Sequence, residues 1–97
     1  MAYKLEIRPL AAMEIIGAFD WYELQREGLG TEFLEELDIF YTALLRNPNS
    51  YGYYDRPVRQ GKINRFPYVV VFEIVGTIVA VYSVFMTKQD PTKRRLG

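Results

Sequence analysis

The residues in this sequence that could act on a phosphate group are basic side chains in its second half. They are Arg56, Arg59, Lys62, Arg65 and Lys88. Cleavage of RNA through its own 2′-hydroxyl needs such cations for the charge that builds on the phosphate, and it also needs groups that accept and donate protons. The sequence has no histidine and no cysteine, which removes the commonest general base and all thiol chemistry. The cations for phosphate chemistry are therefore present, whereas the usual proton carrier is not.

Proton transfer would fall to Lys88, to a loop tyrosine such as Tyr51, or to an isolated carboxylate. We expect the carboxylates of this half, Asp55, Glu73 and Asp90, to make ion pairs and turns instead. The usual zinc-ligand patterns and the P-loop motif are also missing from the sequence. We therefore expect no metal and no cofactor, and a nuclease is possible but not favoured.

Three tyrosines gather in a segment rich in Asn, Ser, Gly and Pro, between residues 47 and 55. They are Tyr51, Tyr53 and Tyr54. Tyrosines in a polar loop can stack on nucleic-acid bases, but more often they cover an exposed sheet edge. We favour the second role.

The net charge of zero conceals two halves of opposite sign. Residues 1–45 contain three basic and nine acidic side chains, and residues 46–97 contain nine basic and three acidic ones. This asymmetry indicates either a positive surface that faces an acidic partner or acidic helices that attract basic sheet edges within the chain. The sequence does not decide between the two.

The elements that must position these residues form one α+β domain over 1–97, in the order β-α-α-β-β-β, with 90–97 as a frayed tail. Residues 3–8 alternate as a strand, and Pro9 is suited to the first turn of a helix that runs to about residue 27. The 28–30 segment, Gly-Leu-Gly, supplies a left-handed cap and a turn. A second helix starts at Thr31, whose hydroxyl can cap it, and ends before residue 48.

A β-hairpin over residues 66–85 is predicted to organise the sheet, because nearly every residue in it is β-branched or aromatic. Gly76 can take the positive φ of the turn. A membrane-spanning helix of this length is disfavoured by Glu73, Pro67 and Gly76. The basic 56–65 segment adds a third strand, and the helical hairpin lies on one face of the sheet.

Alternation along the hairpin predicts that both sheet faces are apolar. One face carries Tyr68, Val70, Phe72 and Val84, and the other carries Val69, Val71, Val79, Val81 and Phe85. Because one helical hairpin covers only one face, the second face would need a protein partner.

Each helix also has a predicted apolar face. The first has a wide apolar arc that includes Leu10, Met13, Ile16, Trp21 and Leu24, expected to touch both the sheet and the second helix. The second has a core face of Leu34, Leu37, Tyr41 and Leu44.

This order of elements, with markers along nearly the whole chain, resembles the RelE/ParE superfamily of bacterial type II toxins. The matching residues are Trp21–Tyr22–Glu23, Gly28–Leu29–Gly30, Phe33, Pro48, Tyr51, Arg59, Phe66–Pro67–Tyr68 and Asp90–Pro91. The resemblance implies a small toxin that a cognate antitoxin wraps and inhibits. The first five residues lack the apolar segment of a signal peptide, so we expect the protein to be cytoplasmic. Some members cleave mRNA on the ribosome, and members of the ParE branch poison DNA gyrase.

The sequence departs from the ribonuclease branch at the end of its last strand. Relatives there usually have a histidine followed by an arginine, where this chain has Met86, Lys88 and Gln89. Three functions remain: a gyrase inhibitor of the ParE-like branch, which we favour, a ribosome-dependent endoribonuclease, or an inactive scaffold that only binds its partner. Under the first, the basic residues Arg56, Arg59, Lys62, Arg65 and Lys88 bind the target. Under the second, Arg59, Arg65, Lys88 and Tyr51 are the catalytic candidates.

Overall fold

The computed structural model describes residues 2–87 of the chain. Its elements are β1 (Lys4–Ile7), α1 (Pro9–Gln25), α2 (Leu29–Arg46), a 3-10 turn (Pro48–Ser50), β2 (Tyr53–Asp55), β3 (Val58–Lys62), β4 (Tyr68–Val75) and β5 (Ile78–Met86). The predicted α+β fold is confirmed, with β2 as one further strand in the tyrosine-rich segment. Lys88, Gln89, the Asp90–Pro91 marker and the predicted frayed tail lie outside the described residues.

The five strands form one sheet in the order β1-β5-β4-β3-β2. Strand β1 pairs parallel with β5, and the other three pairings are antiparallel. The hairpin of β4 and β5 is therefore the centre of the sheet, as predicted. Its turn contains Gly76 with φ of 63°, a left-handed conformation that suits glycine.

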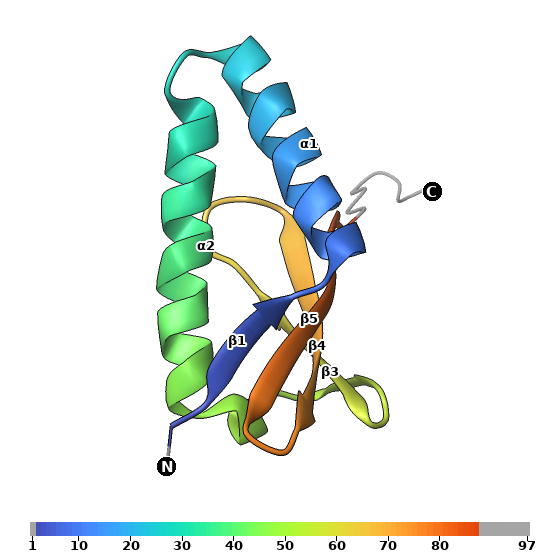
Figure 1. Ribbon diagram of the computed structural model, residues 1–97. Helices are drawn as coiled ribbons and strands as arrows, with labels where there is room; N and C mark the ends of the chain where they lie inside the picture. Colours follow the sequence, from blue (N-terminus) through green and yellow to red (C-terminus); the bar gives the residue numbers. More distant parts are fainter. Residues whose placement is uncertain (1, 88–97) are drawn as a thin grey trace, which may run out of the picture.

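The two helices lie side by side as a hairpin against one face of the sheet, and the turn between them projects past the strands (Figure 1). The core between helices and sheet is made of Ala11, Ala18, Tyr22, Phe33, Leu37, Phe40, Leu44, Ile63, Phe66, Tyr68, Val70, Phe72, Val79, Val81 and Val84. Within the described part of the chain, none of the helices has the length and apolar character needed to cross a membrane.

The start of α2 differs from the prediction because a side chain of α1 caps it. The Glu23 carboxylate accepts hydrogen bonds from the backbone N–H of Gly30 at 2.8 Å, of Gly28 at 3.1 Å and of Thr31 at 3.3 Å. A carboxylate that accepts these otherwise unpaired donors stabilises a helix N-terminus. The helix therefore begins at Leu29, and the prediction that the Thr31 hydroxyl caps it is wrong.

A β-bulge in β5 changes which residues face the core. Val71 pairs with Ser83 and Phe72 pairs with Val81, so Tyr82 is an extra residue in the strand. Because an extra residue shifts the alternation by one position, Val79 and Val81 face the helices together with Val84. Their predicted placement on the other face is wrong.

The second sheet face is not an open apolar surface, contrary to the prediction. Val69 is only 8% exposed and Val71 only 5%. Val69 is paired with Lys62 and Phe85, and Val71 with Gln60 and Ser83.

Most of the exposed large apolar residues lie on the helices instead. Leu10 is 57% exposed, Met13 70% and Leu24 84%. Helix α1 contacts both β5 and α2, as predicted, but these three residues of its predicted apolar arc remain exposed. Leu34, predicted in the core face of α2, is 39% exposed, while Phe33 is fully buried in its place.

One buried polar group leads to a prediction about stability. The Tyr41 hydroxyl is buried and has no hydrogen-bond partner among residues 2–87, and burial raises the pKa of Tyr41. Removing an unpaired buried hydroxyl relieves its desolvation cost, so we expect Tyr41→Phe to raise the free energy of unfolding by about 1 kcal/mol. Urea denaturation checks this. A loss of stability would mean that the hydroxyl bonds to water or to a group beyond the described residues.

Candidate functional site

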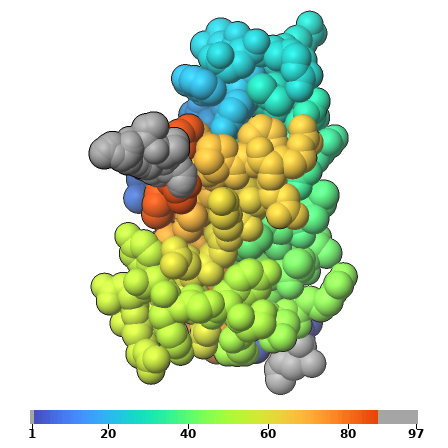
Figure 2. All heavy atoms as spheres, turned by 180° about the vertical axis from the view of Figure 1, so that it is seen from behind, coloured from blue at the N-terminus to red at the C-terminus, as the bar shows by residue number. Residues whose placement is uncertain are grey.

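Four of the five basic residues predicted to bind a target are described by the structure, and they lie on β3, on the β2–β3 turn and on the β3–β4 loop. Seen from behind, β3 and β4 cross the middle of the molecule, and the segment from the end of α2 to β3 gathers at its base (Figure 2). The structure gives these residues very different surroundings, which decide what each can do.

Arg59 is bonded to its own chain. Its guanidinium donates hydrogen bonds to the Tyr51 carbonyl at 2.6 Å, the Asn49 carbonyl at 3.3 Å and the Tyr53 hydroxyl at 3.0 Å. These bonds fasten the segment before β2 to β3. Arg59 therefore has a structural role. To bind its guanidinium, a phosphate would have to compete with these three hydrogen-bond acceptors.

Tyr51 is likewise part of the packing. Its ring contacts Phe40 and Phe72, with centroid distances of 5.6 Å and 5.7 Å. Gly61 lies close to the Phe40 and Tyr51 rings. A Cβ on Gly61 would be 2.6 Å from Phe40 and 2.9 Å from Tyr51. The ring is therefore held against the core, and the predicted role of covering the sheet fits Tyr51 better than base stacking does.

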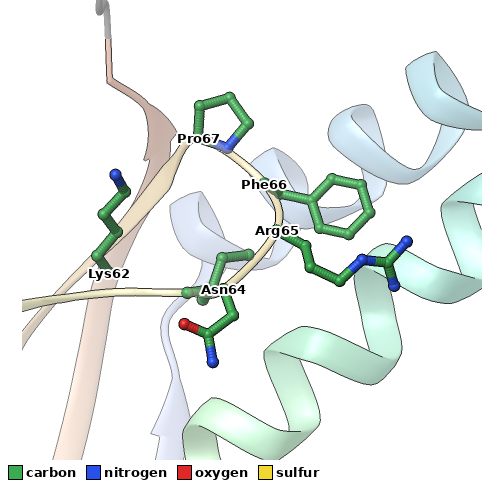
Figure 3. A pocket seen from close by; sticks show the side chains of 6 residues that line it. Lys62, Asn64, Arg65, Phe66 and Pro67 are labelled. Carbon is green, nitrogen blue, oxygen red and sulfur yellow. The ribbon is translucent and has the colours of Figure 1, made fainter.

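Arg65 is paired with the acidic second helix. Its guanidinium donates to Glu32 at 2.7 Å and lies 3.6 Å from Glu36, and its side chain extends toward the helices (Figure 3). Arg26 also pairs with Glu32, at 3.3 Å, and hydrogen bonds from Arg65 and then Arg26 lower the pKa of Glu32. Part of the charge asymmetry of the sequence is therefore an attraction within the chain, although exposed pairs of this kind contribute little to stability.

Arg56, Tyr53 and Tyr54 form an exposed group at the β2–β3 turn. The guanidinium carbons of Arg56 and Arg59 each lie 4.3 Å from the centre of the Tyr53 ring, a cation–π distance. Tyr54 is 55% exposed, and its ring centre lies 6.4 Å from that of Phe85. Arginine and tyrosine dominate the energetics of many protein interfaces, and this group is open to a partner.

Lys62 lies on the outer side of the β3–β4 loop. It is exposed and lines an open depression of about 430 Å³ with the loop residues up to Pro67. Figure 3 shows it on the opposite side of the loop from Arg65 and Phe66. Among the predicted target-binding residues that the structure describes, only Arg65 forms an ion pair with another described residue. Arg59 is hydrogen-bonded to its own chain, whereas Arg56 and Lys62 are exposed.

The sequence analysis missed a polar group on the second sheet face. The Tyr82 hydroxyl donates to Glu73 at 2.6 Å, and this bond is the main cause of the raised pKa of Tyr82. The Arg8 guanidinium lies 5.9 Å from the centre of the same ring and 3.8 Å from Glu6. The carboxylate could accept a proton and the arginine could contact a phosphate. The bulge brings Tyr82 to Glu73, and no signal in the sequence reveals a bulge.

No cluster of three potential metal ligands is found within residues 2–87. At the end of β5, where relatives of the ribonuclease branch were expected to have histidine, Met86 is 47% exposed. The described part of the candidate site thus consists of Arg56, Lys62 and the exposed tyrosines, with Arg59 and Arg65 engaged internally.

Comparison with known proteins finds solved structures with a similar fold. Neither family models nor curated sequences match the chain, but solved structures do. A chain of the chromosomal ParDE toxin–antitoxin system from P. aeruginosa superposes with a TM-score of 0.79 at 17% identity, covering 89% of this chain and 97% of that one. The isolated E. coli RelE toxin gives 0.71 at 19% identity, covering 96% and 93%. A chain of the intact E. coli RelBE complex gives 0.69 at 20% identity, covering 91% and 100%.

Proposed function

We propose that this chain, which has the RelE/ParE fold, is the toxin of a type II toxin–antitoxin system and acts in the cytoplasm by inhibiting DNA gyrase. Its partner is a cognate antitoxin protein. The similarity to chains of ParDE and RelBE systems over most of their length supports the toxin role. A fold is shared by proteins of different activity, so the choice of target needs its own argument.

The observation that carries the choice of gyrase is the engagement of Arg59 and Arg65 within the chain. A ribonuclease site has to place cations around a phosphate as charge develops. Here Arg59 is bonded to two backbone carbonyls, and Arg65 is paired with Glu32 and Glu36. Binding of a protein target needs no such site and can use the exposed Arg56, Lys62 and Tyr54.

The alternative, a ribosome-dependent ribonuclease, has one specific observation in its favour. Glu73, Tyr82 and Arg8 bring a carboxylate, a hydroxyl and a cation together on the second sheet face. Such a set could exchange a proton with RNA and contact its phosphate. Under this alternative, Glu73→Gln would lower mRNA cleavage by a factor of about 10² or more, while inhibition of gyrase would not depend on it.

Charge reversal at Arg56 and Lys62 tests the target surface. We expect Arg56→Glu with Lys62→Glu to weaken inhibition of purified gyrase roughly tenfold, because two exposed charges contribute up to about 1 kcal/mol each. The loss should shrink at high salt, which screens exposed charges. Lys4→Glu, a reversal on β1 at the far edge of the sheet, is the matched control and should leave inhibition unchanged.

The same preparation should also be added to translating ribosomes. Untouched supercoiling together with cleaved mRNA would overturn the choice of gyrase, and activity in neither assay would favour the inactive scaffold. The antitoxin is tested separately: where a short reading frame adjoins the gene, co-expression of its product should restore growth and yield a stable complex.

A further inference from the structure

The outer face of α1 is an apolar stripe that the described chain leaves uncovered. It consists of Leu10, Met13, Gly17 and Leu24, with Ile16 and Trp21 beside it. Met13 is 70% exposed, Ile16 61% and Leu24 84%. The spacing of three, four and seven residues places the four stripe residues on one side of the helix, as in the contact line of a helix pair.

No contact of Gly17 with the described residues explains why this position is glycine. A Cβ added to it would meet nothing within 4 Å, and its φ is not in the left-handed region. Glycine in a helix interior is about 1 kcal/mol less favourable than alanine. Its advantage at this position is that a second backbone can approach closely, as small residues allow where helices cross.

The stripe is symmetric about Gly17. Leu10 precedes it by seven residues and Leu24 follows it by seven, and Met13 and Trp21 are each four residues away. If two copies of α1 cross in opposite directions at Gly17, Leu10 of each lies opposite Leu24 of the other, and Met13 lies opposite Trp21. This self-complementarity is the requirement for a two-fold interface.

We propose that two copies of this chain associate through the outer faces of their α1 helices, antiparallel and with the two-fold axis at Gly17. The proposal concerns a surface separate from the target-binding residues and does not rest on the proposed function. Because the net charge is zero, there is no net long-range electrostatic repulsion between two copies. The five apolar side chains of the stripe and its flanks supply several hundred Å² of apolar area per copy, the same order as the roughly 800 Å² per partner of a stable interface.

The charges near the axis are compatible with this pairing. In the antiparallel arrangement Asp20 of one copy lies opposite Glu14 of the other. The Glu14 carboxylate is turned toward the sheet, where it accepts hydrogen bonds from Ser83 and from the Val84 backbone at 2.8 Å each. The two acidic groups therefore do not meet directly across the interface.

Light scattering and sedimentation of the purified full chain test the proposal. We expect a dimer. We expect Leu24→Glu to raise its dissociation constant roughly a hundredfold or more, because a two-fold interface contains the substituted residue twice, once from each copy. Val75→Glu, at a residue 54% exposed at the end of β4, is the control and should leave the dimer intact. A wild-type chain that stays monomeric at all concentrations would overturn the proposal and point to a different protein on this face.

Cysteine cross-linking tests the geometry, since the chain has no cysteine of its own. Gly17→Cys should form a disulfide-linked dimer on mild oxidation, because the axis brings the residue against its own copy within disulfide reach. Leu10→Cys and Leu24→Cys should each stay uncrosslinked alone and should link to one another when mixed. Self-linking of Leu10→Cys would indicate parallel helices and contradict the proposed interface.

Discussion

Gly30→Val is expected to lower the free energy of unfolding by about 3 kcal/mol, the upper end of the usual cost of overpacking. At Gly30, α2 lies very close to α1. A Cβ at this position would lie 2.7 Å from the backbone oxygen of Phe19, 2.7 Å from its ring and 2.8 Å from the Glu23 side chain. Because one of these atoms belongs to the backbone of α1, the helices would have to separate to make room.

Urea denaturation followed by circular dichroism measures this effect. Gly52→Val is the matched control, because a Cβ on Gly52 meets nothing within 4 Å, and we expect it to change stability by no more than about 0.5 kcal/mol. Equal losses in the two variants would contradict the packing argument and point to a general effect of replacing glycine.

The order of the main elements could be predicted because each carries a strong local signal. Pro9 sits at the start of α1, and the turn glycine of the β4–β5 hairpin, Gly76, has the expected positive φ. The short β2 had no such signal, since three residues of a tyrosine-rich loop show no periodicity. Its pairing depends on β3, whose Arg59 pairs with Tyr53.

The site was harder to predict because its electrostatics depend on contacts between distant residues. The sequence identified Arg65 as a cation, but its partner Glu32 is 33 positions away, and only the fold brings the two together. The same holds for Tyr82 and Glu73, which meet across two strands. Sequence patterns therefore located the charges of this protein without showing which of them remain available to a partner.

The face of each strand residue could be predicted only as far as the bulge. Alternation by two assumes that no residue is inserted in the strand. The extra residue, Tyr82, reverses the assignment for Val79 and Val81. What supports the bulge is Glu14 of α1, whose Oε1 accepts a hydrogen bond from the Ser83 hydroxyl and one from the Val84 N–H, both at 2.8 Å. A helix side chain thus satisfies backbone that the strand ladder leaves unpaired.

Glu14→Ala is accordingly expected to lower the free energy of unfolding by about 3 kcal/mol, because it leaves the Val84 N–H and the Ser83 hydroxyl without their shared acceptor in a partly buried place. Glu14→Gln keeps one oxygen that can accept both bonds, as a neutral and weaker acceptor, so its loss should be less than half as large. Ser83→Ala, which removes only the hydroxyl, should cost about 1 kcal/mol. Denaturation gives the three values, and hydrogen exchange should show faster exchange at the Val84 amide in Glu14→Ala. If the alanine variant were as stable as the glutamine variant, the bulge would not depend on this carboxylate, and the register of β5 would have to be set by core packing of Val79, Val81 and Val84 alone.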